Sequence, residues 1–138
     1  MTTLDGMKAR IEDAKGIAGT LGACWDAFEL IQQVAGKYVD PDSDLFYAFL
    51  SAMTTACEGR DAVGFAPSMP SGVGLAVAPL SPGDVPSDDA ADIIAQLASQ
   101  LTSKLTGAAA LPCTPGDRQA FQRAAASAAE IRDLLSGQ

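Results

Sequence analysis

The stretch that decides the fold is LDGMKARIEDAKGIAGTLGACWDAFELIQQVAG, which runs from Leu4 to Gly36. Its apolar residues recur at alternating spacings of three and four, as they do on a helix that lies along the core of a helical bundle. The members of this stripe are Leu4, Met7, Ile11, Ala14, Ala18, Leu21, Trp25 and Phe28. The spacing predicts a helix over 4–36, which would be about 50 Å long if it were continuous.

Glycines within this stretch leave two interpretations open. Gly16, Gly19 and a third glycine at position 22 each cost about 1 kcal/mol relative to alanine in a helix interior, which favours a break or kink. Alternatively, Gly16, Gly19, Ala23 and Ala27 lie on the side opposite the apolar stripe, where their small size lets another helix approach closely. In that case the helix is continuous and packed on two sides.

The next helix is expected to begin at Asp40. Asp40 is a good N-cap and Pro41 suits the first helical position. Asp42 and Asp44 then fall in the first turn, where acidic side chains are favourable. The apolar residues that follow predict a mostly buried helix that ends near Gly59, or one turn later if residues 60–63 continue it.

Two further helices have clear starting signals. Ser87 is a suitable N-cap for a helix that ends near Gly107. Thr114 is an N-cap followed by Pro115 in the first turn, and Asp117 stands three residues after the cap, close to a capping box. The apolar spacing after Asp117 predicts a helix that packs along the first one.

Between the second and third expected helices the composition changes. Residues 66–87 hold five of the eight prolines, a density that excludes a helix. Val73, Leu75 and Val77 alternate with small residues, which is the period of a short strand. We therefore expect one all-α domain over 1–138, a four-helix bundle in which 66–87 forms a long, extended, Pro/Gly-rich crossover.

Charge and length exclude several classes of protein. The chain has 138 residues, with 9 Lys and Arg against 17 Asp and Glu and a formal net charge of −8. Its few basic residues are scattered, so we expect no binding to nucleic acid or to an anionic membrane. Its apolar runs are shorter than the ~20 residues of a membrane helix, and the N-terminus lacks the pattern of a secretory signal. Three cysteines, an odd number, favour a reducing compartment, so we expect a cytoplasmic protein.

Histidine is absent from the sequence. Its absence excludes Ser-His-Asp and Cys-His catalytic systems, His-ligated zinc and His-containing di-iron sites. The thiol of Cys113, just before an expected helix N-terminus, could be reactive or simply a small apolar loop residue. Cys24 and Cys57 lie on apolar helix faces and are expected in the core.

Two short patterns resemble ligand-binding motifs but lack the residues that complete them. Ser71-Gly72-Val73-Gly74 is glycine-rich, yet the Gly-Lys-Ser/Thr of a phosphate loop does not follow. Asp40, Asp42 and Asp44 alternate as in a calcium loop, but the glycine and glutamate that complete such a loop are missing. We expect no catalytic residues, no cofactor and no metal, and hence a protein that is not an enzyme.

The first functional hypothesis is a non-catalytic interaction, scaffold or regulatory protein that acts as a homo-oligomer, most simply a dimer, with a further protein partner also conceivable. Charged residues make up 19% of the chain, against the usual value of about 25%, so less polar material covers the surface. Two segments are candidates for the interface. They comprise Gly16, Gly19, Ala23 and Ala27 in the first helix, and Val73, Leu75 and Val77 in the crossover.

The alternative hypothesis is a protein that binds or carries a small apolar ligand. Aromatic residues of the first two helices would line a pocket between them, with the crossover as its lid. These residues are Trp25, Phe28, Tyr47 and Phe49. Tyr38, Tyr47, Glu29 or Arg60 would supply polar anchors for the ligand.

Overall fold

The computed structural model describes residues 4–70 and 85–136, which form five helices and no strand. The helices are α1 (Leu4–Asp13), α2 (Gly16–Lys37), α3 (Phe46–Gly64), α4 (Ser87–Ala109) and α5 (Pro115–Leu135). The expected all-α class is confirmed. The expected count of four helices is wrong, because the N-terminal stretch forms two helices.

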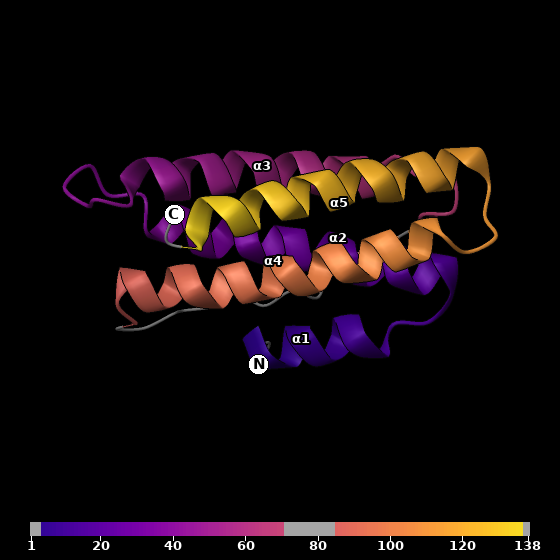
Figure 1. The fold of residues 1–138 in the computed structure, drawn as a ribbon, viewed down its shortest axis with the longest axis horizontal. Helices are drawn as coiled ribbons and strands as arrows, with labels where there is room; N and C mark the ends of the chain where they lie inside the picture. The colour runs from indigo at the N-terminus through magenta and orange to yellow at the C-terminus, as the bar shows by residue number, and fades with distance from the viewer. Residues whose placement is uncertain (1–3, 71–84, 137–138) are drawn as a thin grey trace.

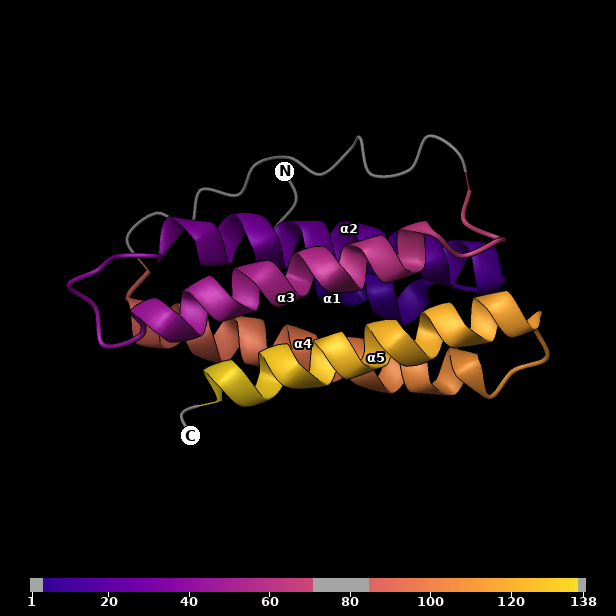
Figure 2. The ribbon, with the colours of Figure 1, turned by 90° about the horizontal axis from the view of Figure 1, so that it is seen from above.

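The four longer helices lie alongside one another, and α1 lies outside them against α2 and α4 (Figure 1). α5 packs along both α3 and α4, and α3 also packs along α2 (Figure 2). α5 runs antiparallel to α3 and to α4, so α3 and α4 run in the same direction. The end of α3 and the start of α4 consequently lie at opposite ends of the molecule. Most of the expected crossover, including Val73, Leu75 and Val77, lies outside the described residues.

The N-terminal stretch breaks at Ala14 and Lys15, so the continuous-helix interpretation is wrong and the break is confirmed. Gly16 has φ +75°, in the left-handed region that residues with a Cβ avoid. This backbone conformation reverses the chain, and α1 folds back antiparallel to α2 (Figure 1). The apolar stripe that predicted one helix is therefore divided between two helices. Met7 and Ile11 of α1 and Leu21 and Phe28 of α2 are buried, whereas Ala18 is exposed.

Apolar and polar contacts hold α1 in place. Met7 and Ile11 are fully buried. From α4, Gln100 Nε2 donates a hydrogen bond to the Lys8 carbonyl at 2.7 Å, and Lys104 Nζ donates to the Ala14 carbonyl at 2.8 Å. An isolated helix of ten residues is not stable in water, so α1 depends on these contacts.

α3 begins at Phe46, six residues after the expected start at Asp40. Asp40 Oδ1 accepts a hydrogen bond from the Asp42 amide at 3.0 Å, and Ser43 Oγ accepts one from the Leu45 amide at 3.1 Å. Such local side-chain bonds stabilise turns and compete with helix formation. The acidic residues therefore form a turn before the helix instead of capping it.

The expected starts of the last two helices are confirmed, but the expected cap of the first is wrong. α4 begins at Ser87, whereas Pro86 occupies the cap position without a side-chain cap hydrogen bond, and α4 ends at Ala109 rather than Gly107. At the start of α5, Thr114 Oγ1 accepts a hydrogen bond from the Asp117 amide at 3.1 Å. This is the cap that the sequence predicts.

α2 and α3 approach most closely where Phe28 lies against Gly59. Both residues are buried, and a Cβ built at Gly59 would stand only 2.6 Å from Cζ of the Phe28 ring. Only glycine leaves room for the ring at this position. The contact thus sets the distance between the two helices and the rotation of α3 about its axis.

Replacement of Gly59 by alanine should therefore lower the free energy of unfolding by about 1–3 kcal/mol, because the added methyl group overpacks the Phe28 ring. Urea denaturation followed by circular dichroism measures the change. The matched control is Gly107→Ala, which places a methyl group in open space within α4 and should be neutral or stabilise by up to about 1 kcal/mol. Equal effects of the two substitutions would contradict the packing argument.

Candidate functional site

The predicted interface on the first helix is not a continuous surface of the folded chain. Gly16 and Gly19 are exposed, but Ala23 is 3% exposed and Ala27 is fully buried. Because the stretch is broken, α2 buries this side as well within its own chain. Val73, Leu75 and Val77 lie outside the described residues.

The predicted pocket residues do not converge on a cavity. Phe28 and Phe49 are fully buried in the core, and the Phe28 ring fills the space over Gly59. Tyr47 is 77% exposed on the outer side of α3. The aromatic residues of α2 and α3 thus belong to two different environments, and the space between the helices is occupied by protein.

Three of the four predicted polar anchors, Arg60, Glu29 and Tyr38, are engaged within the protein, and the fourth, Tyr47, is exposed. Arg60 Nη1 donates hydrogen bonds to Glu29 Oε1 at 2.6 Å and to Gln32 Oε1 at 2.7 Å, and its guanidinium lies 5.8 Å from the centre of the Trp25 ring. The bond to Glu29 raises the pKa of Arg60 above its ordinary value. Tyr38 donates to the Val85 carbonyl at 2.8 Å. These groups tie α2 to α3 and to the start of α4.

A groove runs between α3 and α5 on the outside of the molecule. Near the start of α3 it has a volume of about 750 Å³. Its walls are Tyr47, Ala48 and Ser51 from α3, with Ala126, Ala129, Glu130, Asp133 and Leu134 from α5. Four of these eight wall residues are alanine or serine, and the exposed ring of Tyr47 also lines the groove.

A second hollow, of about 210 Å³, lies between the same two helices at the opposite end. Ala62, Phe65 and Pro67 line it on one side, and Gly116, Gln119, Ala120 and Arg123 on the other. Phe65 is 87% exposed, the largest exposure among the large apolar side chains of the described residues. We call the surface that contains both hollows, with Tyr47 and Phe65, the α3/α5 face.

The sequence analysis did not single out Phe65, although a signal was present. Tyr47 and Phe65 are eighteen residues apart, which is about five helical turns, so they project from the same side of α3. That side of α3 carries no other large apolar residue, so it lacks the regular apolar spacing that predicts a buried helix face. Two isolated aromatics on a polar helix side are the pattern that marks this face.

Partly buried polar contacts join α3, and the segment that follows it, to α5 at the α3/α5 face. Thr55 Oγ1 donates to Glu130 Oε2 at 2.6 Å, and Ser68 Oγ donates to Asp117 Oδ2 at 2.6 Å. Burial alone would raise the pKa of Asp117, but hydrogen bonds from Ser68 and Thr114 hold it below its ordinary value. The carboxylate therefore remains ionised and keeps the segment after α3 attached to α5.

A buried carboxylate lies on the other side of the molecule, between α1 and α2. Asp26 is 1% exposed; its Oδ2 pairs with Arg10 of α1, and its Oδ1 has no hydrogen-bond partner among the described residues. Burial raises the pKa of Asp26, and the nearby guanidinium opposes this in part. No apolar periodicity marks Asp26, so the sequence analysis missed this pair.

The three cysteines are free thiols. Cys24 is fully buried, and burial raises its pKa to about 12. Cys57 and Cys113 are half-buried. Arg118, the cation nearest to Cys113 in sequence, donates from Nε to the Ala109 carbonyl at 3.1 Å and so contacts the end of α4.

The pKa of Asp26 predicts the sign of a pH effect. Because the folded-state value lies above the unfolded value near 3.8, the ionised carboxylate costs stability, and this cost appears as the pH rises through the folded pKa. Asp26→Asn keeps the shape but cannot ionise. The free energy of unfolding of the wild type minus that of the variant should therefore fall as the pH rises above the unfolded-state value of about 3.8. Urea titrations measure it, and a difference that rises with pH would mean that the pair with Arg10 outweighs burial.

The burial of Cys24 predicts a count of reactive thiols. A thiol with a pKa of about 12 has on the order of one part in ten thousand as thiolate near pH 8, and it is also shielded from reagent. Ellman's reagent should therefore titrate two thiols rapidly in the native protein and three in denaturant. Cys24→Ala should leave the native count at two and lower the denatured count to two. Three rapid thiols in the native wild type would show that Cys24 is accessible.

Within residues 4–70 and 85–136, no three His, Cys, Asp or Glu side chains are grouped as metal ligands would be, and no helix has the length and apolar character needed to cross a membrane. Comparisons with known proteins found no matching protein family, no matching curated protein and no matching solved structure.

Proposed function

We propose that the chain is a non-catalytic interaction protein, of the scaffold or regulatory kind, that acts as a homo-oligomer, most simply a dimer. The observation that carries the proposal is the exposure of two aromatic residues on one side of one helix, Tyr47 at 77% and Phe65 at 87%. Burial of a large apolar side chain contributes about 1.5–3 kcal/mol, so both rings gain from being covered. Aromatic residues are also enriched at the centres of protein interfaces.

The proposed scaffold is a four-helix bundle formed by α2–α5, with a long crossover between α3 and α4 and with α1 as an added helix. The common direction of α3 and α4 supports such a crossover. The core that these helices share, together with the contacts of Thr55 and Asp117, makes the α3/α5 face a rigid surface. A rigid face loses little conformational entropy when it binds.

The low content of charged residues, 19%, supports the same proposal, because a surface with fewer charges is easier to desolvate. The free thiols support a reducing, cytoplasmic setting. The groups that a ligand carrier would use as anchors, Arg60 and Glu29, bind each other. For this reason we favour a protein interface over a ligand pocket.

Native mass spectrometry of the untagged protein tests the proposal, since one spectrum reports subunit number and any retained ligand. We expect a species near twice 14.1 kDa at micromolar concentration. A monomer with additional mass would favour the ligand carrier instead. A bare monomer at every concentration would overturn the proposal.

A further inference from the structure

We infer that a second copy of the chain docks on the α3/α5 face about a two-fold axis that lies in the plane of the face and crosses both helices. α3 then packs antiparallel against α3 of the partner, and α5 against α5. The inference rests on the proposed function, and it adds the surface, the symmetry and the residues that meet. Four features of the face lead to it: the aromatics, the charges, their common centre and the area.

The aromatics are placed symmetrically on α3. Tyr47 and Phe65 project from the same side at its two ends, about 27 Å apart. In an antiparallel pair about a two-fold axis, each residue faces the one at the mirrored position along the helix. Tyr47 of each copy therefore meets Phe65 of the other, and both exposed rings in each subunit are covered by aromatic contacts.

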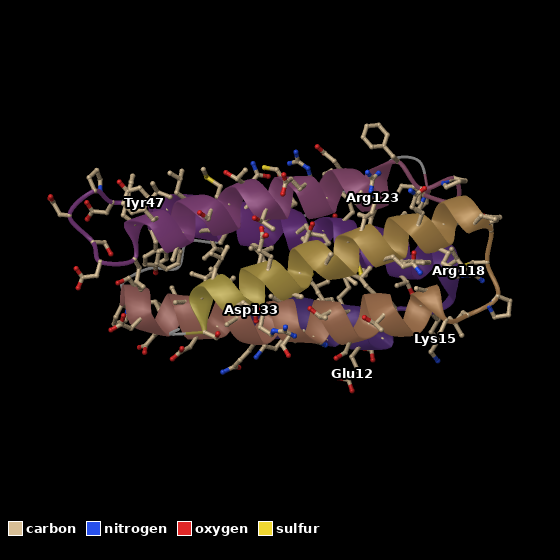
Figure 3. The ribbon with its side chains drawn as sticks, turned by 45° about the horizontal axis from the view of Figure 1, so that its top comes forward. Glu12, Lys15, Tyr47, Arg118, Arg123 and Asp133 are labelled. Atoms are coloured by element: carbon tan, nitrogen blue, oxygen red, sulfur yellow. The ribbon has the colours of Figure 1, made fainter. Side chains whose placement is uncertain are left out.

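The charges on α5 follow the same rule. Arg123 and Glu130 are seven residues apart, about two turns, and both are exposed. Arg123 has no ion pair or hydrogen bond within residues 4–70 and 85–136, and Glu130 uses one carboxylate oxygen for Thr55. Figure 3 shows the direction of α5 across the face. Asp133, which follows Glu130 by three residues, lies toward the Tyr47 end, and Arg123 lies toward the other end. The axis brings Arg123 of each copy opposite Glu130 of the other, so opposite charges meet twice.

One axis serves both helices. The midpoint between Tyr47 and Phe65 on α3 is Ala56, and the midpoint between Arg123 and Glu130 on α5 lies between Ala126 and Ser127. The hydrogen bond between Thr55 and Glu130 shows which residues of the two antiparallel helices are level, and it places Ala56 level with position 129. The two midpoints therefore differ by about 4 Å along the bundle. An axis midway between them leaves each facing pair about 4 Å out of register, which is less than one helical turn.

The remaining acids of α3 do not oppose the pairing. In the antiparallel arrangement centred on Ala56, Glu58 faces Thr54 of the partner and Asp61 faces Ser51 of the partner. All four side chains are exposed. A hydroxyl group can donate a hydrogen bond to a carboxylate, whereas two facing carboxylates would repel each other. A partner with another distribution of charge would lack this agreement, so the face fits a second copy of the same chain.

The area of the face is sufficient for a specific dimer. Two helices of about 10 Å width and about 30 Å length present roughly 600 Å² per subunit, or roughly 1,200 Å² in total. This lies at the lower edge of the range for specific protein interfaces. We therefore expect a dimer that forms and dissociates in the micromolar range.

Charge reversal tests the pairing. Arg123→Glu and Glu130→Arg should each weaken dimerisation about tenfold in sedimentation experiments, because like charges then meet twice. An equal mixture of the two variants should form the heterodimer in preference to either homodimer, since opposite charges meet again. Misfolding of one variant could not be rescued by mixing. If neither the single variants nor the mixture differs from the wild type, the inference is wrong.

Truncation of the aromatics tests the rest of the face. Tyr47→Ala and Phe65→Ala should each weaken the dimer about tenfold or more, with little change in thermal stability because both rings are exposed in the monomer. Leu111→Ala is the matched control, since Leu111 is 51% exposed but lies on the connection between α4 and α5. An equal effect of all three substitutions would contradict this placement.

A cross-link locates the axis. In a background with Cys57→Ser and Cys113→Ser, Ala126→Cys should form a disulfide-linked dimer on mild oxidation, because position 126 lies next to the axis on both copies. Ser99→Cys, an exposed position on α4, should not. If the wild type is a dimer but Ala126→Cys does not cross-link and charge reversal has no effect, the homo-oligomer stands and this surface is wrong. If the wild type is monomeric throughout, the proposed function fails first.

Discussion

The contact between Phe28 and Gly59 is the constraint on which the arrangement of the outer helices depends. Because no side chain at position 59 separates the helices, the Phe28 ring fixes the rotation of α3 as well as its distance from α2. Tyr47 and Phe65 lie about 120° around α3 from Gly59, beyond the part of its surface that α2 and α5 cover. The exposure of the two rings is therefore a consequence of core packing, and the chain cannot bury them by a small rotation of α3.

Local end signals predicted a helix start correctly where they fit one local structure, and they failed where they fit two. The Thr114 cap and the first-turn proline gave the start of α5 correctly, because these signals act through bonds within a few residues. The start of α3 was misplaced because Asp40 satisfies the criteria for a cap and for a turn equally well, and only its bond to the Asp42 amide decides between them. Rules for helix ends succeed where only one local structure satisfies the polar groups of the segment. They fail where two local structures, here a helix cap and a turn, satisfy them equally well.

The candidate site could not be predicted from the spacing of apolar residues, because that spacing does not show where the chain reverses. The stripe through Met7, Ile11, Leu21 and Phe28 is real, but it does not reveal that Gly16 adopts φ +75° and folds α1 back onto α2. Once the chain reverses, the small residues Ala23 and Ala27 become interior positions. The predicted face of small residues is thus divided, because Ala23 and Ala27 are buried within the chain whereas Gly16 and Gly19 are exposed. The sequence analysis missed Phe65 because one aromatic residue on a polar helix side does not form a periodic apolar stripe.

The two sides of the molecule differ in whether their large apolar side chains are covered, and this difference bears on the size of the assembly. On the side of α1, Met7 and Ile11 are buried, and Gln100 and Lys104 bind backbone carbonyls. On the α3/α5 face, the aromatic rings are open to solvent. In the proposed dimer, attraction between copies is therefore concentrated on one face. A two-fold axis through that face makes each copy cover the other's face, which leaves no equivalent surface for a third copy. The symmetry that we propose for the aromatics and the charges would thus also end the assembly at two subunits.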